Sequence, residues 1–353
     1  MPRVAFVSFR LGLDDGVSIV ADAWADAFVR LGFETTTVAA DGPVDAVVPG
    51  LGLGARLGDA TTPPPTPDAT DRALLAEAVA DVDLVVVENL LSIPLNLPAS
   101  ALVADVLAGR PTIVHHHDPP WQRERFAHVT ELPVDDPAWR HVTINQLTAD
   151  EFAERGIDAT CIYNGFDLPT RVGDRAGLRA ELDVADDERL VVHPARAIAR
   201  KNIGAALDLC ADLGATYWLT GRAEEGYDDE LARLLGEARC RVIRRPVPDR
   251  VDLYAAADLV AFPSTWEGFG NPPVEAALHR RPVAVGDYPV AAELRSLGFD
   301  WPFPDECELL AAELEAPDRG RLDRNFDVAE RHLSAAAMTE GLQRLLERAG
   351  WWP

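Results

Sequence analysis

Apolar runs and segments of helical periodicity alternate along most of the chain. Short, nearly continuous apolar runs, such as Arg3–Phe9 and Asp83–Glu88, predict strands that are buried on both faces. Between these runs, Val17–Leu31 carries apolar residues at helical spacing. The repeated order of strand and helix is typical of a parallel sheet with helices on both faces.

The same alternation starts again in the second half of the chain. Leu190–Pro194 and Thr216–Thr220 predict strands, and Gly204–Leu213 predicts the helix between them. A chain of 353 residues has room for about two domains. The pattern therefore predicts two doubly wound α/β domains, with ligands expected at the carboxyl edge of each sheet.

Charge and hydropathy exclude some classes of partner. The formal net charge is −25, so polyanionic nucleic acid is not an expected partner. No apolar run approaches the ~20 residues of a membrane-spanning helix. The N-terminus carries an acidic pair where a signal peptide would be apolar, which predicts a cytoplasmic protein.

The stretch Ala261–Gly286 combines an apolar strand, a glycine-bearing loop, a helix and a second apolar strand. Gly268 and Gly270 remove side chains from the loop, so its backbone can approach a ligand closely. Pro272 and Pro273 suit the first turn of a helix, where an amide hydrogen has no partner. A helix N-terminus facing such a loop is suited to binding phosphate.

Two glutamates in this stretch carry a resemblance to a known family. Glu267 and Glu275, with PS before them and EAALHRRPVAV after them, resemble the signature of retaining GT-B glycosyltransferases, glycosyltransferase family 4. The resemblance implies that Glu267 contacts the donor sugar and takes part in catalysis, and that Glu275 holds the ribose of the nucleotide. It also implies that Gly268, Phe269 and Gly270 line the donor site. Taken singly, each glutamate has an ordinary alternative. Glu267 could be a solvated loop carboxylate, and Glu275 could be an acidic residue that stabilises the first turn of a helix.

Basic residues lie between the first strand of the second half and its helix. Lys201 is the only lysine among the 33 basic residues, and Arg196 precedes it in the same loop. The resemblance implies that this pair clamps the donor diphosphate and stabilises it as it leaves. It further implies that Gly16, in the first loop of the chain, faces the diphosphate. The alternatives are solvated side chains at Arg196 and Lys201 and plain turn geometry at Gly16.

Three adjacent histidines end the strand Pro111–His116 and begin the segment HHHDPPWQRERF. Successive strand residues point to opposite faces, so only His115 and His117 can converge. No carboxylate at ligand spacing is evident, and no metal site is predicted. The resemblance implies that His117 meets the donor sugar near the reacting bond. Core packing is the alternative for His115 and His116.

For the whole chain, the resemblance implies a GT-B fold, with two Rossmann-like doubly wound parallel-sheet domains facing an interdomain cleft. The expected acceptor-side domain covers residues 1–168 and the expected nucleotide-sugar domain covers residues 169–326. Residues 327–353 are expected to form a helix that returns to the first domain. No metal or other cofactor is implied, since the protein supplies the positive charge.

The function implied is retaining transfer of a hexose from a nucleotide diphosphate sugar to a small acceptor. The segments VENLLSIPLNLP and HHHDPPWQRERF resemble those of mannosylglucosylglycerate synthase-type enzymes, which suggests a glycerate-type or glucosylglycerate-type acceptor. Arg123 and Arg125 could pair with an anionic acceptor, and Trp121 could support a sugar ring. The alternative for these three residues is that the segment forms an exposed helix start, in which the arginines pair with nearby glutamates. Two alternative functions remain. The chain could be a nucleotide-sugar epimerase or phosphorylase on the same fold, or it could be a non-catalytic nucleotide-sugar-binding subunit.

Overall fold

The chain divides into two compact units. The computed structural model describes residues 1–13, 15–53, 63–247 and 249–352. Unit 1 consists of Met1–Gly165 and Ala335–Pro353, and unit 2 consists of Phe166–Ser334. The chain thus leaves unit 1, builds unit 2, and returns to unit 1 with its last helix.

Unit 1 is built on a parallel sheet, as its apolar runs predict. In the described part of the chain the sheet has seven strands in the order β3-β2-β1-β4-β5-β6-β7, and neighbouring strands run parallel. The strands are β1 (Arg3–Val7), β2 (Glu34–Ala39), β3 (Ala46–Val47), β4 (Leu84–Glu88), β5 (Thr112–His116), β6 (Trp139–Thr143) and β7 (Ala159–Cys161). The α-helices are α1 (Gly16–Arg30), α2 (Ala69–Ala78), α3 (Leu97–Leu107), α4 (Gln146–Glu154) and α13 (Ala335–Ala349). Single 3-10 turns occupy Pro49–Leu51, Pro120–Gln122 and Glu124–Phe126.

Alternation along the central strands explains why they are apolar throughout. Ala5 and Val7 of β1 join a core that includes residues of α2 and α3. Val4 and Phe6 point the other way, into a core with α1 and α13. Because helices cover both faces of the sheet, neither face has polar side chains at these positions.

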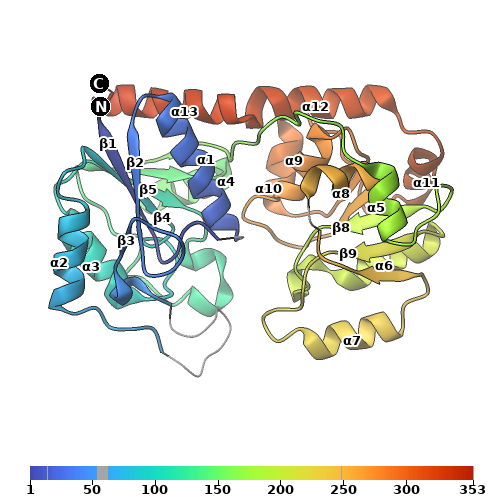
Figure 1. The fold of residues 1–353 in the computed structure, drawn as a ribbon, viewed down its shortest axis with the longest axis horizontal. Coiled ribbons are helices and arrows are strands. Elements are labelled where there is room, and N and C mark those ends of the chain that lie inside the picture. The colour runs from blue at the N-terminus through green and yellow to red at the C-terminus, as the bar shows by residue number, and fades with distance from the viewer. Residues whose placement is uncertain (14, 54–62, 248, 353) are drawn as a thin grey trace. The chain divides into compact units, whose positions relative to one another are not determined.

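The last helix completes the second of these cores. Met338, Leu342, Leu345 and Leu346 of α13 are buried beside Trp24 and other residues of α1. Figure 1 shows α13 running along α1. The predicted tail helix, from about Asp327, spans parts of two helices in the structure, because Ser334 is extended between α12 and α13.

Unit 2 repeats the arrangement with a smaller sheet. Among the described residues its five parallel strands follow the order β10-β9-β8-β11-β12. The strands are β8 (Leu190–His193), β9 (Thr216–Leu219), β10 (Val242–Arg244), β11 (Leu259–Phe262) and β12 (Val283–Val285). The helices are α5 (Arg175–Glu181), α6 (Ile203–Asp212), α7 (Asp228–Gly236), α8 (Arg250–Ala256), α9 (Asn271–Leu278), α10 (Pro289–Ser296), α11 (Cys307–Glu315) and α12 (Arg319–Leu333), with a 3-10 turn at Ala199–Lys201. The prediction of two parallel-sheet α/β domains is therefore confirmed.

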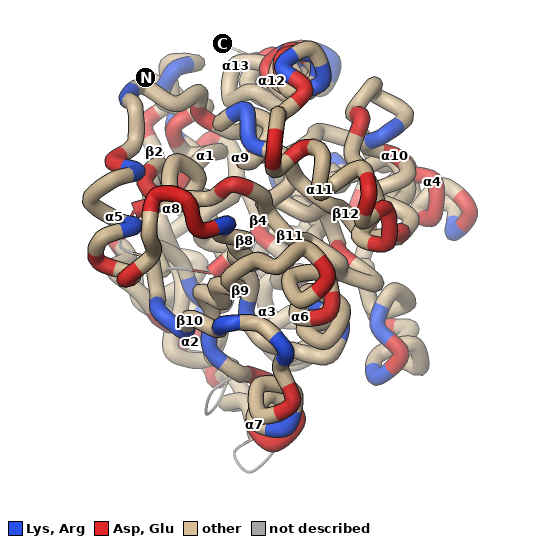
Figure 2. Tube along the Cα trace, turned by 90° about the vertical axis from the view of Figure 1, so that its right-hand side faces the viewer, with Lys and Arg blue, Asp and Glu red and all other residues tan. Residues whose placement is uncertain are grey.

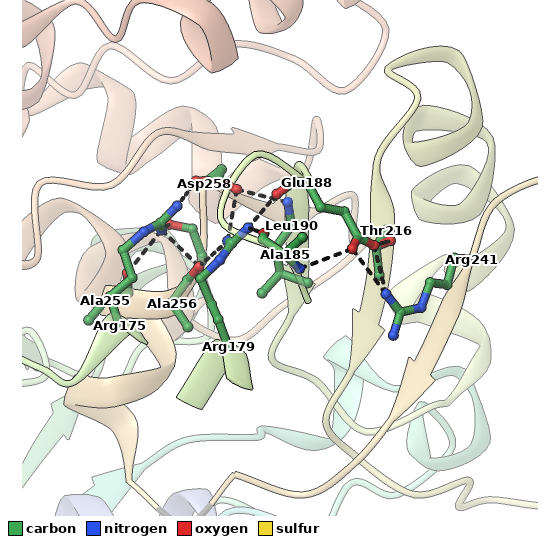
Figure 3. Close-up of polar contacts among 11 residues, drawn as sticks. Arg175, Arg179, Ala185, Glu188, Leu190, Thr216, Arg241, Ala255, Ala256 and Asp258 are labelled. Atoms are coloured by element: carbon green, nitrogen blue, oxygen red, sulfur yellow. Dashed lines mark hydrogen bonds and ion pairs between the residues drawn. The ribbon is translucent and has the colours of Figure 1, made fainter. Parts of the chain in front are cut away.

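A buried arginine ties α5 to the sheet of unit 2 (Figure 3). The side chain of Arg179 is 1% exposed and donates to the carbonyls of Ala256 at 3.0 Å and Ala185 at 2.6 Å, and to that of Glu188. It also pairs with Asp258, at 3.2 Å between Nη1 and Oδ2. Asp258 in turn accepts the backbone N–H of Leu190 at 2.8 Å. The guanidinium therefore gives each of these three carbonyls a buried side-chain donor.

The negative charge is spread over both units. Figure 2 shows Asp and Glu on α4 of unit 1 and on α7 and α8 of unit 2. None of the described helices is both long and apolar enough to cross a membrane.

Candidate active site

In unit 2, the glycine-bearing loop lies between β11 and α9, at the carboxyl edge of the sheet. Gly270 has a φ of 99°, and a Cβ there would lie 2.4 Å from the hydroxyl oxygen of Tyr288. Only glycine fits this turn without strain. Phe269 is buried and stacks on Phe166, with 6.1 Å between the ring centroids, so it would offer a ligand its backbone rather than its ring. Gly268 lies between it and Glu267.

Glu267 is buried and pairs with two cations from the loop after β8. Nζ of Lys201 lies 2.5 Å from Oε1 of Glu267, and Nη1 of Arg200 pairs with Oε2. Lys201 is 9% exposed and Glu267 is 6% exposed, so this charge cluster is largely removed from water. The structure thus joins two predicted residues, Glu267 and Lys201, and adds Arg200, which the sequence analysis did not single out.

Burial and charge compete within this cluster. Burial lowers the pKa of Lys201 to about 8, although the charge of Glu267 opposes the shift. Burial raises the pKa of Glu267, but the charges of Lys201 and Arg200 outweigh it and hold that pKa below its usual value. Glu267 is therefore ionised at neutral pH, and Lys201 titrates closer to neutrality than an ordinary lysine does.

Arg196 lies in the same loop but has a different partner. Its side chain is half exposed and pairs with Glu224, at 2.7 Å between Nη1 and Oε2. Its charge also contributes to lowering the pKa of Lys201, after burial and the charge of Arg200. Three cations, Arg196, Arg200 and Lys201, therefore lie in the loop after β8.

Glu275, one helical turn into α9, pairs with residues of α8. Its Oε2 accepts a hydrogen bond of 2.5 Å from the hydroxyl of Tyr254, and its Oε1 pairs with Arg250. Burial and the charge of Glu275 raise the pKa of Tyr254 well above its usual value, so the hydroxyl keeps its hydrogen. The side chain of Glu275 is 15% exposed, which leaves it accessible to a ligand.

In unit 1, Gly16 is the first residue of α1. A Cβ added there would meet nothing within 4 Å, so packing does not require glycine at this position. The N-cap residue Asp15 accepts from the backbone N–H groups of Val17 at 3.1 Å and Ser18 at 3.3 Å, and it pairs with Arg10 at 3.1 Å. A phosphate binding here would share these amides with Asp15.

His115 and His117 converge, as the strand alternation predicts, and they converge on a carboxylate that the sequence analysis missed. Glu88, the last residue of β4, lies 3.0 Å from Nδ1 of His115 and 2.9 Å from Nε2 of His117. β4 and β5 are neighbours in the sheet, with Glu88 in register with His115. The statement that no carboxylate lies at ligand spacing is therefore wrong, because the partner comes from the adjacent strand rather than from the histidine segment.

His116 points to the opposite face and belongs to a separate buried chain. Its Nδ1 is hydrogen-bonded to the hydroxyl of Ser92, and its Nε2 lies 2.8 Å from Nδ1 of His141. His141 continues the chain to Asp135, at 3.0 Å. Burial lowers the pKa of His116 well below its usual value, so a neutral core histidine is the reading that its surroundings favour.

The three candidate acceptor residues contact their own unit. Nε1 of Trp121 donates to Glu151 of α4 at 2.7 Å, and the guanidinium carbon of Arg155 lies 3.9 Å from the centroid of the ring. Arg123 pairs with Asp118, and Arg125 lies over the ring of Phe126 at 4.5 Å. The structure thus gives Arg123 an aspartate as a partner and Arg125 an aromatic face.

Known proteins resemble this chain in sequence and in fold. Residues 190–314 match the family described as glycosyl transferases group 1. The chain is 25% identical to the mannosylglucosylglycerate synthase of Thermotoga maritima, over 97% of this chain and 99% of that protein. A D-inositol 3-phosphate glycosyltransferase of Mycobacterium tuberculosis is 36% identical, over 37% of this chain and 30% of its own length.

Solved structures with the same fold cover nearly the whole chain. Anabaena Alr3699/HepE, in complex with UDP and glucose, superposes with a TM-score of 0.74 and 22% identity, over 99% of this chain and 100% of its own. The sucrose-phosphate synthase of Thermosynechococcus elongatus gives a TM-score of 0.73 at 15% identity, over 99% of each chain. The chain therefore has the fold of GT-B glycosyltransferases, it is similar to a glycosyltransferase over nearly its whole length, and its second unit carries a match to the glycosyl transferases group 1 family.

Proposed function

We propose that this glycosyltransferase moves a hexose from a nucleotide diphosphate sugar to a small anionic acceptor, with retention at the anomeric carbon. The observation that carries the donor half of the proposal is the buried cluster of Lys201, Arg200 and Glu267, with Arg196 in the same loop. Such a cluster offers both cations for a diphosphate and a carboxylate for sugar hydroxyls. A structural neighbour of the same fold is described in complex with UDP-glucose.

In the proposed mechanism, Arg196 and Lys201 bind the donor diphosphate, and Glu267 accepts hydrogen bonds from hydroxyls of the hexose. Glu275 binds the ribose, while the backbone of 268–270 and the N-terminus of α1 at Gly16 approach the phosphates. His117 meets the hexose near the bond that breaks. Each residue other than Gly16 then has a polar group suited to the part of the donor it meets.

The chemical step breaks the bond between the anomeric carbon and a diphosphate oxygen, and the electron pair leaves with the diphosphate. The acceptor oxygen bonds to the anomeric carbon on the same face, and its proton passes to the leaving diphosphate. Arg196 and Lys201 stabilise the charge that develops there. This scheme requires no protein nucleophile, and the two cations take the place that a metal ion would otherwise occupy.

Calorimetry with a panel of nucleotides and nucleotide sugars, with and without a metal chelator, tests donor binding directly. Charge-assisted hydrogen bonds contribute ~1.5–3 kcal/mol, so Lys201→Ala should slow turnover by about 10- to 100-fold. Arg239→Ala, an exposed arginine of unit 2, is the matched control and should turn over normally. Normal turnover of Lys201→Ala at low and saturating donor would contradict the diphosphate role.

The acceptor half of the proposal rests on Trp121, Arg123 and Arg125 and on the relatives named mannosylglucosylglycerate synthase. A glycerate or glucosylglycerate would pair its carboxylate with one of the arginines. To bind it, Arg123 would have to leave Asp118, or Arg125 would have to leave the ring of Phe126. Arg123→Ala or Arg125→Ala should raise the acceptor KM and leave donor binding intact, whereas Arg72→Ala, exposed on α2, should change neither. Preference for neutral acceptors, with both arginine variants silent, would overturn this assignment.

Retention is tested by proton NMR of the first product formed. The anomeric configuration of the donor should be preserved. The same assay without acceptor separates transfer from epimerisation, because an epimerase would consume the donor alone.

A further inference from the structure

A buried carboxylate with two imidazole partners lies at the carboxyl ends of β4 and β5 in unit 1. Glu88 is completely buried, and its Oε2 lies 2.9 Å from Nε2 of His117 and 3.0 Å from Nδ1 of His115. Its Oε1 lies 3.1 Å from the same nitrogen of His115. All of these are hydrogen-bond distances.

The charge of Glu88 determines which imidazole nitrogens carry hydrogens. Burial alone would raise the pKa of Glu88, but the charges and hydrogen bonds of His115 and His117 outweigh it and lower that pKa to about 2. An ionised carboxylate can only accept hydrogen bonds. The nitrogens that face it must therefore both be N–H groups, so neutral His117 carries its hydrogen on Nε2 and a lone pair on Nδ1.

We propose that Glu88 is a positioning residue, which holds His117 in the Nε2–H tautomer so that Nδ1 can accept a hydrogen bond from a hydroxyl of the hexose. This inference rests on the proposed function, in which His117 meets the sugar near the reacting bond. Among the described residues, Nδ1 of His117 has no hydrogen-bond partner, whereas Nε2 is occupied by Glu88. The free nitrogen is the one that a substrate could use.

The backbone around His117 is fixed from the same strand end. Oδ1 of Asn89 accepts from the backbone N–H groups of His117 at 3.2 Å and Asp118 at 3.1 Å. Nδ2 of Asn89 donates to Oδ2 of Asp118 at 3.2 Å. Asn89 has a φ of 57°, a left-handed conformation that asparagine tolerates better than most residues. Glu88 and Asn89 thus fix the ring and the backbone of one histidine from adjacent positions.

His115 completes the arrangement without facing a substrate. It is completely buried, and its ring lies against that of Trp24, with 4.1 Å between centroids. Its N–H occupies the second donor position on Glu88, which compensates the buried charge. His115 therefore holds Glu88, and Glu88 holds His117.

The same three residues could instead ligate a divalent cation, since their ligand atoms lie within 4.8 Å of one another. The hydrogen-bonded arrangement is favoured because the carboxylate already has donors at 2.9 and 3.0 Å. Elemental analysis of the purified full chain distinguishes the two readings. One equivalent of metal that is retained in wild type and lost in Glu88→Gln would overturn the proposal, and metal-free active protein supports it.

The direct test is the tautomer of His117, read by long-range proton–nitrogen NMR on the full chain labelled at histidine nitrogens, without substrate. We expect neutral His117 to be protonated at Nε2. In Glu88→Gln, the negative charge is lost and an NH2 group replaces one of the two acceptor oxygens, so the side chain no longer strongly favours N–H groups on both facing nitrogens. The Nδ1–H form of His117 should appear, and kcat should fall by about 10- to 100-fold with little change in donor KM.

Two further variants and the activity of the wild type distinguish a positioning role from loss of structure and from a wrong proposed function. Glu88→Asp retains an acceptor-only group and should preserve the tautomer and recover part of the lost turnover. Glu313→Gln changes another buried glutamate, paired with Arg321 at 2.7 Å in unit 2, and should leave kcat unchanged. Wild-type His117 protonated at Nδ1, or a Glu88→Gln protein with normal kcat, would overturn the positioning role. Absence of glycosyl transfer by wild type would instead contradict the proposed function, because the tautomer is measured without turnover.

Discussion

Lys201 illustrates at the residue scale how burial makes a cation sensitive to pH. Its pKa is lowered to about 8 by burial, so below pH 8 the ammonium is charged and above pH 8 it loses its proton. If Lys201 binds the diphosphate, donor kcat/KM should fall as the pH rises through about 8, since this parameter reports the free enzyme.

The matched variant for this pH profile is Lys201→Arg. A guanidinium stays charged throughout this range, so the alkaline decrease in donor kcat/KM should disappear even if the overall rate is lower. If donor kcat/KM decreased at alkaline pH in the same way in both proteins, a group other than Lys201 would be responsible for the decrease.

Glu275 accepts a hydrogen bond from Tyr254, whereas Glu267 pairs with Arg200 and Lys201, so the two glutamates can be tested separately. Tyr254 donates to Oε2 of Glu275 at 2.5 Å, so Tyr254→Phe removes one hydrogen bond and keeps the buried ring. Since the ribose is not where bonds change, Glu275→Ala should raise donor KM with a smaller loss in kcat, and Tyr254→Phe should do the same to a lesser extent. Calorimetry that finds unchanged donor affinity in Glu275→Ala would reject the ribose assignment.

The sequence identified the residues that a local motif carries and missed those that depend on strand order. Glu267, Glu275 and Lys201 were candidates because they lie in short segments that resemble a family. Glu88 was missed because its pairing with His117 requires that β4 and β5 be neighbours in register. Arg200 was missed because the spacing of charges along a loop does not reveal which of two adjacent cations will face the carboxylate; here both do.

At the scale of elements, α5 is attached to the segment before β11 by Arg175 and Arg179, of which Arg179 is the fully buried one. Arg179→Met should destabilise unit 2 by about 1–3 kcal/mol, because the buried carbonyls of Ala185, Ala256 and Glu188 each lose a donor and Asp258 keeps Arg175 as its remaining arginine partner. Arg233→Met on α7, which removes only exposed pairs with Glu230 and Glu237, is the control and should leave the unfolding midpoint unchanged. Chemical denaturation followed by tryptophan fluorescence measures both, and equal midpoints for the two variants would contradict the structural role.

Strands were the most predictable elements, since parallel strands covered on both faces are apolar at nearly every position. The break between α12 and α13 was not predictable in the same way. Helical periodicity continues on both sides of Ser334, whereas the extended backbone there coincides with a bridge to Phe166, a contact that sequence periodicity does not encode.

At the scale of the whole molecule, unit 1 depends on residues from both ends of the chain. Deleting 335–353 would expose the core around Trp24 to water, since α13 buries Met338, Leu342, Leu345 and Leu346 there. Each such side chain contributes ~1.5–3 kcal/mol, so the deletion should remove most of the stability of unit 1. Hydrogen exchange should show lost protection in β1 and α1 and retained protection in β8 and β11.

Arg344→Ala, on the exposed side of α13, provides the comparison and should leave protection in β1 and α1 intact. Protection that is retained in β1 and α1 after the deletion would show that the core of unit 1 closes without α13.

The path of the chain also sets an order of assembly during translation. Ribosomes release the N-terminal segment of unit 1 first, but α13, which covers one face of its sheet together with α1, is synthesised only after all of Phe166–Ser334. Unit 2 can therefore fold while the nascent unit 1 still lacks α13 and carries an apolar face that α1 covers only in part. The cell must protect that face from aggregation for the time it takes to make about half of the protein, at roughly 5–20 residues per second. Expression at low temperature or with extra chaperones should accordingly improve the yield of soluble protein more than it improves that of a fragment comprising 166–334 alone.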